Sequence, residues 1–325
     1  MRVAVIGCGG IGSRRGQAVQ KVEGAELKIG IDVDEAAAHR FGEKFGVEWG
    51  TDWRWAADRP DIDLVIVSTA NNAHAETSIG CLQAGKHVIC EKPLARNPGE
   101  CQAMVEAAQQ HNVKLKTGFN HRYSHSTWKA HELLEQGAIG DVIFIRGRTG
   151  HGAGEQLAQR WFGNFDLSGG GTFLDNGVHL LDLSRWFMGE FVEAVGYKTT
   201  HLPQLGQCED NGFGLYKTAD GRVCALQSSW TQWRGYLMME VFGTNGELII
   251  NYDDSSCTLV RRGGETTTWS YGGVPDRSWE REIEEIMAAV CENREPLANG
   301  YDGMRAVQMA YAVYESAETG RTVRL

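Results

Sequence analysis

The sequence predicts an α/β protein of two domains, with an N-terminal doubly wound parallel sheet and a C-terminal α+β domain that holds an open, mostly antiparallel sheet. The chain has 325 residues, which is more than one compact core usually holds. Apolar strands alternate with helical segments as far as residue 119, and after that strands follow one another directly. Alternation is typical of parallel sheets, whereas consecutive strands are typical of antiparallel ones. We therefore expect domains at residues 1–119 and 120–325.

The expected strands of the first segment are almost continuously apolar. Such strands are typical of a parallel sheet that helices cover on both faces. The expected strands span residues 2–7, 27–32, 64–68, 87–90 and 114–118, and the expected helices span 11–22, 34–46, 74–84 and 98–111.

The second segment has a different pattern. A helix at 126–136 and a strand at 142–149 precede a long glycine-rich loop and an apolar helix at 175–188. Two later connections are short and contain glycine, as β-hairpins require. The remaining expected strands span residues 192–200, 212–217, 223–230, 237–243 and 247–250, and two helices follow at 279–292 and 302–319.

Charge and cysteine usage limit the possible partners and the compartment. The formal net charge is −10 and no block of Lys and Arg occurs, which argues against nucleic acid or an anionic membrane as the main partner. No apolar run reaches the roughly 20 residues that span a bilayer. The eight cysteines are scattered without a Cys-x-x-Cys pair, so we expect reduced thiols, no metal and a cytoplasmic protein.

A glycine-rich turn follows the first expected strand. Residues 7–12 match G-x-G-x-x-G between an apolar strand and a helix. Such a turn brings a pyrophosphate to the helix N-terminus, where N–H groups and the helix dipole attract it. Asp32 lies 20 residues after Gly12, and a carboxylate there suits the ribose of NAD better than NADP. A glycine turn without a ligand is the alternative. The expected NAD contacts are Gly7, Gly9, Gly10, Ile11, Gly12 and Asp32.

Lys92 comes directly after an expected strand and precedes Pro93. The carboxyl ends of parallel strands line the crevice in which open α/β sheets bind ligands. Lys92 is therefore a candidate site residue, and a solvated surface lysine beside a turn is the alternative.

Asp175 and His179 lie four residues apart in the expected helix 175–188, with Asp182 three residues further on. This spacing places the carboxylate and the imidazole on one helix face. A carboxylate that orients an imidazole makes a general base that works near neutral pH. A buried histidine that a helix neighbour satisfies is the alternative, and support for a metal at this motif is weak.

The loop at 149–168 is long, irregular and rich in polar and aromatic residues, which suits substrate binding better than a plain connection. Trp161 presents an aromatic face that is expected to stack on a ligand, and His151 and Arg160 are expected to bind hydroxyls or an anionic group. An oligomer contact is the alternative use of this loop.

Three motifs in order make the chain similar to the glucose–fructose oxidoreductase / inositol dehydrogenase (Gfo/Idh/MocA) family. They are the G-x-G-x-x-G turn, Ala-Gly-Lys-His-Val-x-x-Glu-Lys-Pro at 84–93, and Gly-Gly-Gly-x-x-x-Asp-x-Gly-x-His-x-x-Asp at 169–182. The resemblance implies a Rossmann domain, an α/β domain whose open sheet often forms an oligomer interface, and NAD(P)-dependent oxidation or reduction of a secondary alcohol on a sugar or cyclitol. It also implies that Lys92 contacts the reacting hydroxyl, His179 is the general base, and Asp175 orients it.

The same resemblance assigns further contacts. It implies that Ser68, Thr69, Asn71 and His74 approach the nicotinamide side of the cofactor, with Glu91 and Lys92 nearby. It implies that Asn120, Arg122 and Tyr123 line the junction of cofactor and substrate.

Two other functions stay open from the sequence. Relatives exist that use a transient oxidation to cleave a glycosidic bond, and a non-catalytic sensor could keep the fold to bind NAD or a sugar. The set of Lys92, Asp175 and His179 argues against a sensor, which needs no acid–base group. We expect an enzyme with a small polyol substrate, no nucleic-acid or membrane partner, and a homodimer or homotetramer.

Overall fold

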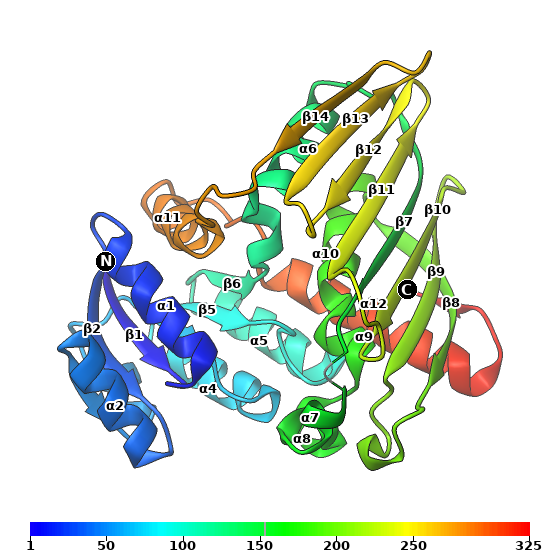
Figure 1. Ribbon diagram of the computed structural model, residues 1–325. Coiled ribbons are helices and arrows are strands. Elements are labelled where there is room, and N and C mark those ends of the chain that lie inside the picture. Colours follow the sequence, from blue (N-terminus) through cyan, green and yellow to red (C-terminus); the bar gives the residue numbers. More distant parts are fainter. Residues whose placement is uncertain (153) are drawn as a thin grey trace. The chain divides into compact units, whose positions relative to one another are not determined.

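The computed structural model describes residues 1–152 and 154–325, which form two compact units (Figure 1). The first unit contains residues 1–120 and 277–304, and the second contains residues 121–276 and 305–325. This division differs from the expected domains in one respect, because a C-terminal segment returns to the N-terminal unit. Within the described residues, no helix is long and apolar enough to cross a membrane.

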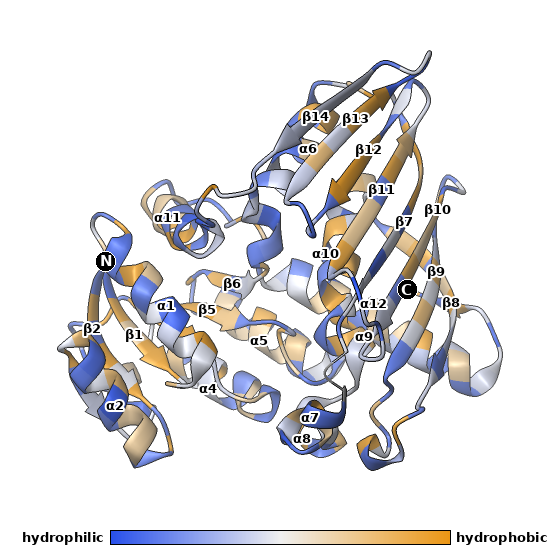
Figure 2. Cartoon of the chain, viewed as in Figure 1, coloured by the Kyte–Doolittle hydropathy of each residue, from blue (hydrophilic) through white to orange (hydrophobic). Residues whose placement is uncertain are grey.

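The first unit is built on a parallel six-stranded sheet with the strand order β3-β2-β1-β4-β5-β6. The order reverses at β1, which is the arrangement of a doubly wound Rossmann sheet. Apart from Arg2, its central strands β1 and β4 are buried and apolar, as the sequence predicts (Figure 2). The strands are β1 (Arg2–Ile6), β2 (Glu26–Ile31), β3 (Glu48–Gly50), β4 (Leu64–Val67), β5 (His87–Glu91) and β6 (Leu115–Gly118).

Local signals explain where the helices of this unit begin. Asp34 accepts hydrogen bonds from two backbone N–H groups at the start of α2, and Asn97 caps α5, which has Pro98 in its first turn. Helix α11 packs against α1 and brings the segment 277–304 into the unit. The helices are α1 (Gly10–Lys21), α2 (Glu35–Phe45), α3 (Arg54–Asp58), α4 (Asn71–Gln83), α5 (Pro98–Gln110) and α11 (Ser278–Cys291).

The second unit is built on a nine-stranded sheet with the order β14-β13-β12-β11-β7-β10-β9-β8-β15. All neighbours pair antiparallel except β7 and β10, which run parallel. The fold class that the sequence predicts is therefore confirmed. The strands are β7 (Val142–Gly150), β8 (Phe191–Thr199), β9 (Asn211–Thr218), β10 (Val223–Ser229), β11 (Leu237–Gly243), β12 (Gly246–Asn251), β13 (Ser256–Arg261), β14 (Thr266–Ser270) and β15 (Val323–Arg324).

Helices cover one face of this sheet. Helix α10 packs on β7 and β10, and α6 packs on β12 and β13. Gly147 makes the close approach of α10 possible, since a Cβ there would lie 3.2 Å from the Leu180 side chain. The helices are α6 (His125–Glu135), α7 (Gly154–Ala158), α8 (Phe165–Ser168), α9 (Thr172–Asp175), α10 (Gly177–Met188) and the C-terminal part of α12 (Gly300–Thr319).

One expected helix is divided in the structure. The sequence predicts a continuous helix at 175–188, whereas α9 ends at Asp175 and α10 begins at Gly177. The expectation that Asp175 and His179 lie on one regular helix face is therefore wrong. Asn176 joins the two helices, and its carbonyl accepts the His179 N–H at 3.2 Å, a short-range bond that tightens this turn.

Candidate active site

The glycine turn has the geometry that the sequence predicts. Gly7 has a φ of +93°, and a Cβ there would lie 2.5 Å from the backbone of Ser68. A Cβ at Gly12 would lie 1.8 Å from the Gly7 carbonyl oxygen. These two glycines are therefore required by the turn itself. A Cβ at Gly9 or Gly10 would meet nothing within 4 Å, so these two leave space over the turn that a ligand can use.

The start of α1 fits the pyrophosphate of a dinucleotide. The helix begins at Gly10 without a side-chain cap, and Gly9, Gly10 and Ile11 are exposed. Uncapped N–H groups at a helix N-terminus bind anions. The buried hydroxyl of Ser68, which follows β4 and borders Gly7, has no hydrogen-bond partner within residues 1–152 and 154–325. Both features are polar groups that a bound dinucleotide would satisfy.

Asp32 is held at the end of β2 by backbone donors. The Cys8 N–H donates to its Oδ2 at 2.8 Å and the Asp34 N–H donates to its Oδ1 at 3.0 Å. These bonds fix the carboxylate beside the glycine turn, and a carboxylate at this place binds the adenosine ribose in dinucleotide-binding folds. Burial raises the pKa of the neighbouring Cys8 thiol to about 12, so this thiol stays protonated.

His74 links the two loops that follow β4 and β5. Its Nδ1 lies 3.0 Å from the Pro93 carbonyl oxygen, and its Nε2 lies 3.1 Å from the Thr69 carbonyl oxygen. The ring is buried, and burial lowers its pKa. Both ring nitrogens therefore bond to backbone carbonyls, so His74 supports the loops beside it. The expected approach of His74 to the nicotinamide stays a prediction.

The loops that His74 joins carry the other expected residues of this unit. Ser68 and Thr69 directly follow β4, and Asn71 is a buried residue in the first turn of α4. Lys92 directly follows β5, and its peptide bond to Pro93 is cis. Since β4 lies between β1 and β5, both loops lie at the same edge of the sheet as the glycine turn.

The carboxylate of Glu91 is committed to an ion pair. Arg15 Nε donates to Glu91 Oε1 at 2.7 Å, and both side chains are buried. The carboxylate of Glu91 therefore contacts α1, and the expected contact of Glu91 with the cofactor stays a prediction. A Cβ at Gly118, the partner of Glu91 in β6, would lie 2.7 Å from Arg15 Nη2, so this glycine makes room for the pair.

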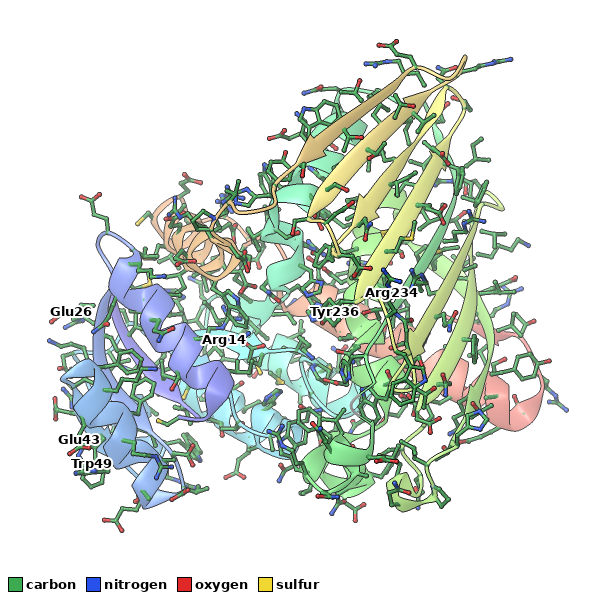
Figure 3. The ribbon with its side chains drawn as sticks, in the orientation of Figure 1. Arg14, Glu26, Glu43, Trp49, Arg234 and Tyr236 are labelled. Atoms are coloured by element: carbon green, nitrogen blue, oxygen red, sulfur yellow. The ribbon has the colours of Figure 1, made fainter. Side chains whose placement is uncertain are left out.

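In the second unit, the imidazole of His179 is buried in the first turn of α10 and stacks on another imidazole. The rings of His121 and His179 have centroids 3.8 Å apart and planes inclined by 8°. Tyr252 and Tyr236 surround the pair, with their ring centroids 5.0 Å and 5.8 Å from that of His121. Figure 3 shows Tyr236 on the loop that leads into β11. Two tyrosines and two histidines therefore form one aromatic cluster.

Arg122 and Asp182 form a buried ion pair. Arg122 Nε donates to Asp182 Oδ2 at 2.8 Å, and its guanidinium carbon lies 5.2 Å from the centre of the Trp186 ring. Tyr123 is also buried and stacks on Trp128 at 6.1 Å. Asp182 therefore anchors the segment before α6. Arg122 and Tyr123 hold this segment in place, and their expected place at the junction of cofactor and substrate stays a prediction.

A buried carboxylate positions the helix that ends in Asp175. Glu209 accepts hydrogen bonds from the N–H groups of Gly171 and Phe173 and from the Tyr314 hydroxyl, at 2.9, 2.8 and 2.9 Å. A Cβ at Gly171 would lie 1.9 Å from the Glu209 carbonyl oxygen. The glycine run before α9 is thus needed for this contact.

The loop before α8 already has internal contacts. His151 Nε2 accepts from the side-chain amide of Asn176 at 3.0 Å, which connects the loop to the junction of α9 and α10. The Trp161 ring stacks on Phe162 with centroids 3.8 Å apart, and Arg160 is exposed above Phe162. Ala153, in the middle of the expected binding loop, lies outside the described residues.

Sequence reasoning did not select His121, Asn176 or Glu209. His121 follows Asn120, an expected substrate contact, and the two share a short 3-10 turn. A histidine between two selected residues was an available signal. No sequence pattern indicates the contacts of Asn176 and Glu209, because their partners lie far along the chain or depend on the break between α9 and α10. In the part of the chain that the structure describes, no group of His, Cys, Asp and Glu could hold a metal.

Family models match both segments of the chain. The oxidoreductase family with an NAD-binding Rossmann fold matches residues 1–119, and the GFO/IDH/MocA C-terminal domain matches residues 127–249. The chain is 30% identical to a myo-inositol 2-dehydrogenase of Thermotoga maritima, over 100% of this chain and 98% of the relative. It is 29% identical to a levoglucosan dehydrogenase of Pseudarthrobacter phenanthrenivorans, over 70% and 65% of the two chains.

Solved structures resemble this one over its full length. A levoglucosan dehydrogenase in complex with NADH and levoglucosan superposes with a TM-score of 0.92 at 26% identity, covering 100% of this chain and 99% of that one. An aldose-aldose oxidoreductase from Caulobacter crescentus in complex with glycerol gives a TM-score of 0.91 at 25% identity, with the same coverage of both chains. The expected family, fold and NAD cofactor are thereby confirmed.

Proposed function

Because the chain belongs to the Gfo/Idh/MocA family of NAD-binding oxidoreductases, we propose that it is a dehydrogenase that oxidises a secondary alcohol of a sugar, a cyclitol or a related polyol. The observation that carries this proposal is the position of Lys92. It follows a parallel strand at the same sheet edge as an uncapped glycine turn and Asp32, where open α/β sheets bind their ligands.

Lys92 and His179 share the acid–base work in this proposal. The first unit would hold NAD, whose nicotinamide would supply the acceptor for the hydride of the alcohol carbon. The ammonium of Lys92 stabilises the negative charge that develops on the alcohol oxygen, and His179 accepts the hydroxyl proton. Asp175, which ends α9, orients His179 and binds a neighbouring hydroxyl. A preorganised contact of this kind lowers the activation free energy by about 2–4 kcal/mol.

The first unit supplies the cofactor contacts. Asp32 binds the adenosine ribose, which favours NAD over NADP, and the turn from Gly7 to Gly12 binds the pyrophosphate. Ser68, Thr69 and Asn71 approach the nicotinamide. Ser68 has the strongest support among them, since its buried hydroxyl lacks a partner in the described chain.

The second unit supplies the substrate contacts. His151 and Trp161 are proposed to bind the substrate together with Asn120, and Arg160 stays a candidate at the exposed edge of the loop. The two relatives named above are dehydrogenases of a cyclitol and of an anhydrosugar, which supports a cyclic polyol as substrate.

A panel of inositols, aldoses, anhydrosugars and sugar acids, offered with NAD and separately with NADP, tests the proposed function. Formation of reduced nicotinamide is followed by absorbance, and the products are identified by chromatography. Net reduction of NAD by at least one cyclic polyol is expected. Release of free sugar from a glycoside without net NADH would instead indicate cleavage through a transient oxidation. Tight binding of NAD with no turnover of any kind would indicate a sensor.

The face of the large sheet opposite its helices is proposed to bind a second copy of the chain. A groove lies on this face between β7, with Arg146 and Arg148, and β8, with Val195. Most of the residues that line the groove are apolar. Large apolar side chains are exposed on this face, namely Phe144, Tyr197, Phe213, Leu215 and Val223.

Light scattering tests this interface. Leu215→Glu is expected to convert a dimer or tetramer into a smaller species, whereas Val274→Glu, at an equally exposed apolar residue outside the sheet, leaves the mass unchanged. A wild-type monomer would refute the interface.

All eight cysteines are free thiols, which supports a reducing compartment such as the cytoplasm.

A further inference from the structure

Arg15 is the largest charged side chain that the first unit buries completely, and it binds two carboxylates from distant parts of the chain. Its Nε donates to Glu91 Oε1 at 2.7 Å, and its Nη1 donates to Glu282 Oε2 at 2.5 Å. The guanidinium also lies 4.4 Å from the centre of the Trp279 ring. One arginine thus ties the end of strand β5 to α1 and to α11.

A buried arrangement of this kind is costly unless each partner is well placed. Taking charges out of water costs several kcal/mol per ion in proteins, and good geometry with additional hydrogen bonds is needed to offset it. Arg15 and Glu282 are both 0% exposed, and Glu91 is 7% exposed. Arginine suits this position because its planar fork presents several donors in fixed directions. A lysine has one ammonium and cannot reproduce the fork.

The position of Glu91 gives this network a link to the site. Glu91 is the last residue of β5, and the next residue is Lys92. On the other side of Lys92, the Pro93 carbonyl is bound by the buried ring of His74 at 3.0 Å. The backbone of Lys92 therefore lies between two anchored residues, one held through its side chain and one through its carbonyl.

We propose that the Arg15–Glu91–Glu282 network positions Lys92, so that Arg15 and Glu282 are positioning residues for the acid–base step although neither directly precedes or follows Lys92. The inference rests on the proposed function for its effect on turnover. Its structural part, the restraint of the Lys92 ammonium, does not depend on which substrate the enzyme uses.

The contacts of Glu91 with Arg15 allow the effect of its position to be tested separately from the effect of its charge. Arg15 Nε and Nη2 both meet the same atom, Glu91 Oε1. Glutamine can supply an oxygen there without the charge, whereas alanine removes the contact altogether. Positioning therefore predicts that Glu91→Gln keeps most of the wild-type kcat. It predicts that Glu91→Ala lowers kcat by about tenfold to a hundredfold, the loss that small misplacements of a reacting group cause, with little change in the Kd for NADH.

The same helix offers a matched control. Glu285 of α11 accepts from Lys116 Nζ at 2.9 Å, in another largely buried ion pair, but Lys116 lies on β6 and not beside Lys92. Glu285→Gln is expected to destabilise the unit without lowering kcat. A second variant, Arg15→Lys, keeps the positive charge but loses the planar guanidinium. It can be measured in place of Glu91→Ala if that variant does not fold.

The experiment measures four quantities for each folded variant: kcat with the polyol found by screening, the Kd for NADH, the urea midpoint, and the rate at which an amine-directed acylating reagent labels Lys92. Labelling is followed by mass spectrometry and referred to the exposed Lys44 of the same chain. A changed Lys92 labelling rate in Glu91→Ala and Arg15→Lys, with wild-type rates in Glu91→Gln and Glu285→Gln, is the expected result.

The possible outcomes separate the two proposals. A changed labelling rate without any measurable dehydrogenase activity in the wild type would uphold the positioning of Lys92 and refute the proposed function. Wild-type kcat and labelling in both Glu91→Ala and Arg15→Lys would overturn the positioning. Equal losses in Glu91→Gln and Glu91→Ala would also overturn it, since charge rather than position would then act.

Discussion

The imidazole rings of His121 and His179 stack in parallel in the second unit, with centroids 3.8 Å apart and an interplanar angle of 8°. Both residues are buried, and they come from different elements, a 3-10 turn before α6 and the first turn of α10. The stack fixes the plane of the proposed general base, because His179 cannot rotate without losing this contact.

Replacement of His121 tests the role of the stack. His121→Phe keeps a flat ring against His179, so kcat/KM is expected to stay within about threefold of wild type, whereas His121→Ala lowers it by about tenfold or more through loss of orientation. Steady-state kinetics with the polyol found by screening gives both values. If the alanine variant equals wild type, the stack has no part in orienting the base.

The pair of Arg122 and Asp182 is expected to govern the stability of the second unit. Arg122→Met leaves the Asp182 carboxylate buried without its guanidinium partner, and this is expected to lower the free energy of unfolding by about 3–5 kcal/mol. The double variant Arg122→Met/Asp182→Leu removes both charges and is expected to recover most of the loss. Urea unfolding measures each value, and a single variant as stable as wild type would contradict the assignment.

Asp32 is expected to set the preference for NAD. In Asp32→Ala, the carboxylate that repels a 2′-phosphate is absent, so the ratio of kcat/KM for NAD to that for NADP should fall by about tenfold or more. Asp34→Asn is the control, because asparagine keeps the N-cap of α2 and the ratio should not change. An unchanged ratio in Asp32→Ala would show that other groups select the cofactor.

His74 is expected to make stability depend on pH. Burial lowers its pKa, so the unfolded chain binds this proton at higher pH than the folded chain does. The stabilisation is therefore present above a pH of about 6.5 and is lost as the pH falls toward the lowered folded-state pKa. His74→Gln should show a shallower decline in the free energy of unfolding from pH 7 to 5 than wild type. A slope in His74→Gln equal to that of wild type would contradict this role of His74.

The first sheet was predictable because its signals are local. Continuous apolar strands such as β1 and β4 and capping residues such as Asp34 mark their elements without reference to the rest of the chain. The return of α11 to the first unit was not predictable. It depends on Glu282 and Glu285, whose partners Arg15 and Lys116 lie more than 160 residues away in the sequence.

The candidate site was likewise predictable from the sequence only in part. Motif spacing was sufficient to select the glycine turn, Asp32, Lys92 and His179. It could not show that the His74 ring bonds two backbone carbonyls or that the Glu91 carboxylate pairs with Arg15, because a motif records residue types and not the direction of their side chains. Motif spacing also could not show the break at Asn176, which separates Asp175 from α10.

A crystal structure with NADH and a polyol that the enzyme turns over tests the central claim most directly. The measured quantities are the distances from Lys92 Nζ and from the nearer ring nitrogen of His179 to the hydroxyl oxygen whose carbon faces the nicotinamide. Both groups are expected within hydrogen-bond reach of that one oxygen, at about 2.6–3.2 Å. A complex competent for turnover in which either group points away from this oxygen would contradict the account.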